Sequence, residues 1–135
     1  MTATETPSVA FVTTADLAFD AAVERARQAL AAEGFGVLTE IDVQATLKNK
    51  LDVDIAPYLI LGACHPPSAY RALRAAPEVG VMLPCNVTVS VEEGRTVVRA
   101  MNPRAALSLL DSAVVAAVAE EVGAALERVI AAVAA

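Results

Sequence analysis

The chain has 135 residues, of which 56% are hydrophobic and 4% aromatic, and its formal net charge at pH 7 is −6. This length and apolar content predict one domain, over residues 8–135, with a core built from small aliphatic side chains. The ten basic residues are scattered, which argues against a nucleic-acid partner because phosphate binding needs clustered Lys and Arg. We expect residues 1–7 to form a flexible polar tail.

The chain has no segment that predicts export or a membrane span. The first residues lack the charged and then apolar pattern of a secretory signal. The most apolar segment, residues 113–135, is interrupted by Glu120, Glu121, Glu127 and Arg128, so it does not fit a membrane helix. Two cysteines in such a chain favour free thiols, and we expect a cytoplasmic protein.

The first half of the chain predicts two strands and two helices. Residues 9–14 alternate as a strand, and Asp16 is placed to cap a helix that ends near Glu33 at Gly34. Residues 35–41 alternate as a half-buried strand. Asp42 is then placed to cap a short helix over residues 43–51.

The segment that follows predicts strand, helix and strand. Residues 58–64 are apolar on both faces, which indicates an interior strand. Pro67 suits the first turn of a helix over residues 68–76. Residues 79–91 alternate as a long strand, and Pro84 within it predicts an edge position or a bulge.

The end of the chain predicts a hairpin and two helices. A turn at residues 92–95 joins the long strand to residues 96–101. Asn102 and Pro103 begin a short helix ending near residue 110, and Asp111 or Ser112 caps the last helix. The whole order, βαβ(α)βαββαα, predicts an α+β domain with a mixed sheet of about five strands and helices packed against it.

Both cysteines lie in the strand–helix–strand segment. A helical crossover would make the two strands parallel, and Cys64 and His65 would then lie at the carboxyl end, where open sheets bind ligands. Cys64, His65 and Cys85 would offer soft ligands to zinc or copper. Alternatively, the two thiols form a redox pair if their Cα atoms lie within about 7 Å.

Each candidate residue also has a structural interpretation. Cys85 shares its strand face with valines, so inert packing in the core competes with a role at a site. Asn86, on the opposite face, either binds a ligand or ties down backbone amides near Pro84. A catalytic Cys–His pair is disfavoured because neighbouring side chains on an extended strand point to opposite faces.

Four blocks resemble the domain-of-unknown-function 302 family, and the resemblance spans residues 9–130. They are DVQATLKNKLDVD at 42–54, YLILGACHPPSAYRAL at 58–73, GVMLPCNVTV at 80–89 and NPRAAL at 102–107. The resemblance implies a small prokaryotic α+β protein, often a dimer, and implies no activity because the family has none established. Family members commonly carry Asn where this chain has His65, so it does not imply an essential histidine.

Three functions are compatible with these patterns. The first is a module that binds a small ligand or a metal ion near Cys64, His65, Cys85 and Asn86, with Cys64 and Cys85 as the metal ligands. The second is a non-catalytic homodimer built on a strand edge or on the Val-rich last helix. The third is a thiol enzyme. The chain carries no Gly-rich phosphate loop and no Ser-His-Asp set, so a binding role is favoured over catalysis.

Overall fold

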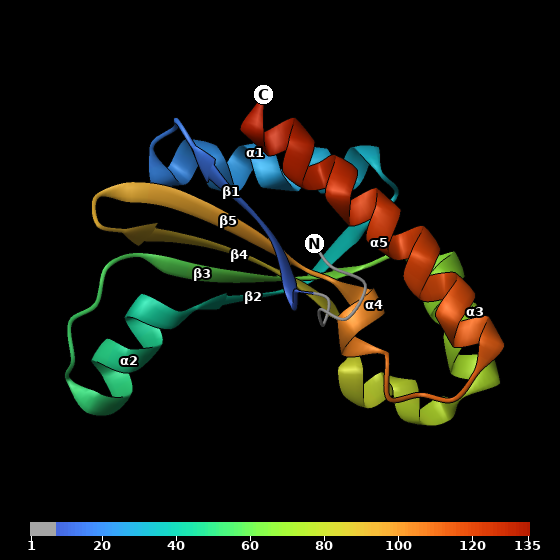
Figure 1. Cartoon of the computed structure of the whole chain (residues 1–135). Helices are drawn as coiled ribbons and strands as arrows, with labels where there is room; N and C mark the ends of the chain where they lie inside the picture. Colours follow the sequence, from blue (N-terminus) through green and yellow to red (C-terminus); the bar gives the residue numbers. More distant parts are fainter. Residues whose placement is uncertain (1–7) are drawn as a thin grey trace.

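The computed structural model describes residues 8–135, and the expected tail at 1–7 lies outside the described residues. The described chain forms one sheet with helices against it (Figure 1). The elements in order are β1 (Ala10–Ala15), α1 (Phe19–Ala32), β2 (Gly36–Asp42), α2 (Val43–Leu51), β3 (Tyr58–Cys64), α3 (Pro66–Ala75), the 3-10 helix η1 (Pro77–Met82), β4 (Cys85–Glu92), β5 (Arg95–Met101), α4 (Pro103–Ala106) and α5 (Ala113–Ala134). This confirms the predicted α+β class.

Within residues 8–135 five strands form a sheet of order β1-β5-β4-β3-β2, and every neighbouring pair is antiparallel. The parallel pairing expected for β3 and β4 is therefore wrong. Cys85, the first residue of β4, lies beside Cys64 because it pairs with Ala63 near the end of β3. The connection between β3 and β4, made by α3 and η1, stays at one end of the sheet, where α3 packs chiefly on α5 and η1.

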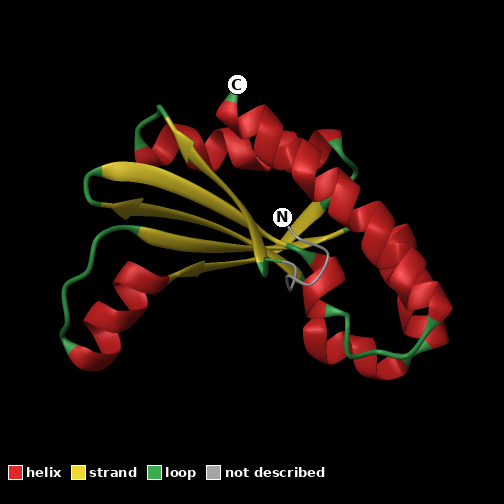
Figure 2. Cartoon of the chain, in the orientation of Figure 1, coloured by secondary structure: helices red, strands yellow, loops and turns green. Residues whose placement is uncertain are grey.

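One face of the sheet is covered by α1 and α5, which lie together on the same side (Figure 2). The alternation of each strand sends its small aliphatic side chains into this layer. Leu61, Val87, Val89 and Val98 are fully buried there. One apolar stripe of α5 packs onto the same core: Val115, Val118, Val122, Leu126, Val129 and Val133.

The segment expected to begin a long strand at residue 79 takes a different path. Residues 77–82 form η1, and β4 begins only at Cys85, after a cis peptide bond between Leu83 and Pro84. The alternation of valines in this segment fits a strand, but Val79 lies within η1 and is fully buried. Tertiary burial of one valine therefore outweighs the strand preference of its neighbours.

Three of the four predicted helix caps form. Asp42 accepts a hydrogen bond from Ala45 N, Asn102 from Arg104 N, and Ser112 from Val115 N. Asp16 does not cap α1, which begins at Phe19 without a side-chain cap. The Thr96 hydroxyl donates to the Leu17 carbonyl at 2.7 Å, and this bond holds the chain before α1 against β5.

Helix α2 extends away from the domain on the side of the sheet opposite α1 and α5 (Figure 1). It has no buried residue, and Leu51 is 67% exposed. Neither α1 nor α5 covers the sheet on this side.

Candidate functional site

A cavity of about 340 Å³ lies where the ends of β3 and β4 meet the helices α3, η1, α4 and α5. Thirteen of its seventeen lining residues are aliphatic, Gly or Pro, and the other four are Cys64, His65, Ser68 and Cys85. No Lys, Arg, Asp or Glu of the described residues lines it. A concave, mostly apolar space with a few convergent polar groups is the usual form of a small-molecule site.

The mouth of the cavity is marked by three exposed residues of its lining, Leu38, Leu73 and Gly80. Leu38 is the extra residue in β2, where the pairing with β3 shifts between Val37 and Thr39. An extra residue of this kind redirects a side chain out of the regular alternation. The irregularity in the edge strand thus turns an apolar side chain toward the cavity.

The polar groups of the cavity gather at the junction of β3 and α3. Cys64 is the last residue of β3, His65 is the N-cap residue of α3, and the buried Ser68 lies in the first turn. His65 Nδ1 and Ser68 Oγ share a hydrogen bond of 2.8 Å. Pro66 and Pro67 occupy the first helical positions, where a backbone amide has no acceptor within the helix, so the missing N–H of proline costs nothing.

Two further contacts hold the imidazole of His65. Its edge meets the ring of Phe35, with ring centroids 5.4 Å apart. Its Nε2 lies 3.2 Å from the position that a Cβ atom on Gly34 would occupy. Gly34 has a φ of +84°, so the glycine that ends the α1 region also leaves room for the histidine ring.

The Cys85 thiol is buried in the cavity wall, and burial raises its pKa to about 11, with a smaller contribution from the charge of Cys64. At neutral pH Cys85 is therefore a thiol and a poor nucleophile. Cys64 is half-buried, and both cysteines are free. Cys64, His65 and Cys85 all line this cavity.

Asn86 is the one candidate residue that does not line this cavity. It is exposed and pairs with Gly62 across the ladder, on the opposite face of the sheet from Cys85. A ligand in the cavity and a ligand at Asn86 would therefore be different ligands.

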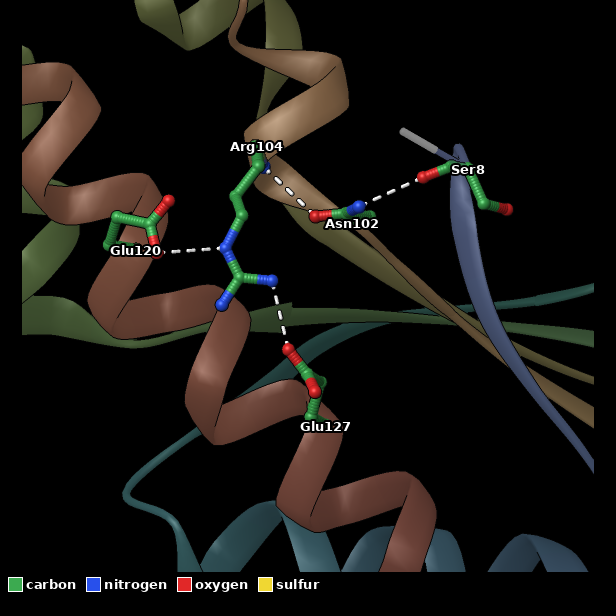
Figure 3. Close-up of polar contacts among 5 residues, drawn as sticks. All are labelled: Ser8, Asn102, Arg104, Glu120 and Glu127. Carbon is green, nitrogen blue, oxygen red and sulfur yellow. Dashed lines mark hydrogen bonds and ion pairs between the residues drawn. The ribbon is translucent and has the colours of Figure 1, made fainter. Parts of the chain in front are cut away.

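Ion pairs made by two arginines hold the helices that form the cavity wall. The Arg104 guanidinium of α4 lies across α5 and donates to Glu120 at 3.0 Å and to Glu127 at 2.8 Å (Figure 3). It passes over Gly123, where a Cβ would lie only 3.2 Å from its Cζ. On the other side, Arg71 of α3 donates to Glu121 at 2.7 Å.

The sequence reasoning missed Ser68 and the aliphatic wall of the cavity. Ser68 carried a usable signal, because a Ser three residues after His65 faces back toward it within the first turn of a helix. The wall did not, because Leu38, Leu107 and Val118 come from separate parts of the chain. Their alternation or helical spacing predicts burial but not a hollow between them.

The described residues contain no group of three or more His, Cys, Asp or Glu side chains placed to hold a metal ion. The metal ligands expected from the sequence, Cys64 and Cys85, belong to no such group within residues 8–135, and a metal ion at these two residues stays a prediction. None of the helices over residues 8–135 combines the length and the apolar character needed to cross a membrane.

The sequence model of a family described as "Domain of unknown function DUF302" matches residues 11–133. A similar solved structure is the crystal structure of the uncharacterized conserved protein DUF302 from Bacillus stearothermophilus, which is 26% identical to this chain. The two superpose with a TM-score of 0.87, and the match covers 93% of this chain and 98% of the other. A search of the curated proteins gave no match.

Proposed function

Since this chain belongs to the DUF302 family, a domain family of unknown function, we propose its function from its own cavity: it binds a small apolar molecule there. The observation that carries the proposal is a volume of about 340 Å³ with an almost entirely apolar lining. An apolar cavity of about 150 Å³ binds one benzene molecule. By this comparison the cavity holds a ligand of roughly 10–14 non-hydrogen atoms.

The chemistry of the lining supports binding over catalysis. Cys85 is protonated at neutral pH because its pKa is raised to about 11, whereas a thiol enzyme needs a lowered thiol pKa. His65 Nδ1 is engaged by Ser68, and no carboxylate of the described residues lines the cavity to act as an acid or base. These groups are suited to orienting a ligand, and they lack an activated nucleophile.

Filling the cavity tests this proposal. Ala69 lines the cavity and is half-buried, whereas Ala75 lies on the same helix, is exposed and does not line it. In an NMR titration with the neutral probe indole, we expect amide shifts among the lining residues of the wild-type protein. Ala69→Phe is expected to weaken indole binding at least about tenfold, and Ala75→Phe to leave it unchanged. Equal binding by both variants, or shifts confined to other surfaces, would disprove the proposal.

We further propose that the sheet face not covered by α1 and α5 forms a homodimer with a second copy of the chain. Exposed apolar side chains continue from this face onto α2, among them Ile41, which is 47% exposed, and Leu51. A helix of nine residues with no buried side chain is marginal by itself, and a neighbouring copy would bury it. The Val stripe of α5, the alternative surface in the sequence, is already buried in the monomer.

Sedimentation equilibrium tests the homodimer. We expect a dimer at micromolar concentration, and Leu51→Glu is expected to shift it to monomer because it places a charge in the interface. Leu109→Glu is the matched control, because Leu109 is 94% exposed and belongs to neither α2 nor the sheet. A monomeric wild-type protein, or equal dissociation by both variants, would rule out this interface.

A further inference from the structure

We infer that the mouth of the cavity rests on an uncharged lipid surface, such as a bilayer of phosphatidylcholine, and that the apolar ligand enters the cavity from that lipid. This inference rests on the proposed function and names the partner of the same site. It follows from the exposed apolar side chains around the mouth, from the small extent of the surface they form, and from the few charges beside them.

The mouth is bordered by apolar side chains that remain exposed in the described chain. Leu38 and Leu73 line the cavity and are both exposed. Leu73 Cδ2 lies 3.7 Å from the position that a Cβ atom on Gly80 would occupy, so α3 and η1 meet at the mouth. Val81, which is 85% exposed, and Met82 follow Gly80 in η1. We call Leu38, Leu73, Val81 and Met82 the rim. Exposed apolar patches mark surfaces that meet a protein or a membrane.

The rim lies apart from the surface proposed for the homodimer. Leu38 is toward the Gly36 end of β2, whereas Ile41 is at its other end, from which α2 continues. Figure 1 shows α2 and α3 at opposite ends of the sheet. A dimer formed through α2 and the open sheet face therefore leaves the rim exposed for a different partner.

The small extent of the rim favours lipid over a protein partner. A stable protein–protein interface takes about 20–30 residues from each side and packs them with matched shapes and hydrogen bonds. The rim consists of four apolar side chains from β2, α3 and η1. A lipid surface requires no matched partner surface, because apolar side chains gain free energy there in proportion to the area that they bury.

The charges beside the rim favour an uncharged lipid over an anionic one. Residues 65–85, which form α3 and η1, include two arginines and one glutamate: Arg71, Arg74 and Glu78. Arg71 is paired with Glu121 of α5. Anionic lipids are bound by clusters of about four to eight Lys and Arg, and the whole chain has a net charge of −6. An anionic surface would therefore repel the chain.

Contact of the rim with lipid also gives an apolar ligand a path into the cavity. No Lys, Arg, Asp or Glu of the described residues lines the cavity, so a ligand that suits it partitions from water into lipid. Leu38 and Leu73 belong both to the rim and to the cavity lining. With the rim on the lipid, the ligand moves from one apolar environment to another without crossing water.

Co-sedimentation with phosphatidylcholine vesicles tests the inference. We expect the wild-type chain to bind the vesicles, and Val81→Glu to bind at least about fivefold more weakly because it replaces an apolar side chain in the contact by a charge. Val12→Glu is the matched control and should bind like the wild type, because Val12 is 53% exposed on β1, at the opposite edge of the sheet from β2. Replacing about one fifth of the lipid by phosphatidylglycerol should weaken wild-type binding.

A transfer experiment tests the path of the ligand. Naphthalene dissolved in the vesicles should reach the cavity at least about fivefold more slowly in Val81→Glu than in the wild type or Val12→Glu, as followed by naphthalene fluorescence. Val81 and Val12 are both exposed, so neither substitution disturbs the core.

The outcomes separate this inference from the proposed function. The inference is overturned if the wild type does not bind vesicles, if Val81→Glu equals the wild type in binding or transfer, or if phosphatidylglycerol strengthens binding. It is also overturned if Val81→Glu changes the oligomeric state without vesicles, because the rim would then contact a second copy. In each of these cases entry of indole into the cavity still upholds the proposed function. If indole does not enter, the proposed function is wrong, and the path of the ligand with it, even where the vesicles are bound.

Discussion

Replacing Gly62 by Ala tests the close packing beneath the cavity. A Cβ atom on Gly62 would overlap with Thr39 Oγ1 and would lie 2.9 Å from Pro84 Cγ. The Thr39 side chain must leave its present position, and the rigid proline ring can move only with its backbone. Overpacking of this kind costs about 1–3 kcal/mol, and the lost chain entropy of glycine returns up to about 1 kcal/mol. We expect a net loss of about 1–2 kcal/mol.

Urea unfolding followed by circular dichroism measures this loss, which corresponds to a melting temperature lowered by roughly 3–8 °C in a chain of this size. Gly36→Ala is the matched control in the neighbouring strand, because a Cβ there meets no atom within 4 Å. We expect Gly36→Ala to leave stability unchanged or raise it by up to about 1 kcal/mol.

A double-mutant cycle identifies the residues responsible. Thr39→Ala removes the hydroxyl and leaves a Thr39 Cβ contact of 3.5 Å, so Gly62→Ala should cost at least about 0.5 kcal/mol less in that background. If Gly62→Ala is as stable as Gly36→Ala, or if the cycle shows no coupling, then β2, β3 and Pro84 do not approach as closely as described.

Three side chains, Glu92, Cys85 and Ser112, carry the further predictions. Hydrogen bonds from Arg99, and to a smaller extent from Ser90, lower the pKa of Glu92 to about 2. The stability that the Glu92 carboxylate contributes is therefore present above the ordinary pKa of 4.5 and is lost as the pH falls toward 2. Glu92→Gln should remove that part of the acid dependence when unfolding is measured as a function of pH. Burial raises the pKa of Cys85 from 9.0 to about 11, so the stability it contributes is full below pH 9 and declines as the pH rises through 11, and Cys85→Ala should flatten this alkaline decline. In the native protein at neutral pH, Cys85 should react with a thiol reagent only on unfolding, and rapid labelling would contradict its burial. Ser112→Ala removes the cap of α5 and should lower stability by about 1 kcal/mol in urea unfolding, whereas an unchanged midpoint would show that the cap contributes nothing.

Much of the secondary structure could be predicted because its causes are local in the sequence. Asp42 and Ser112 cap the helices that follow them, and Gly34 ends the α1 region with its positive φ. The glycine turn at residues 93–94 joins β4 to β5. The opposite faces of Cys85 and Asn86 also follow from strand alternation alone. Each of these features depends on residues within a few positions of one another.

The amino-acid sequence by itself thus determined the α+β class, most element positions and the interior place of β3. The tertiary structure alone decided the antiparallel pairing of β3 with β4, the 3-10 path of residues 77–82 and the cavity. The physical reason is that these depend on contacts between distant segments: α3 packs on α5 and not across the sheet, and Val79 is buried by that packing. Local periodicity predicts which side chains are buried, but only the packed helices leave a hollow beside Cys64, His65 and Cys85.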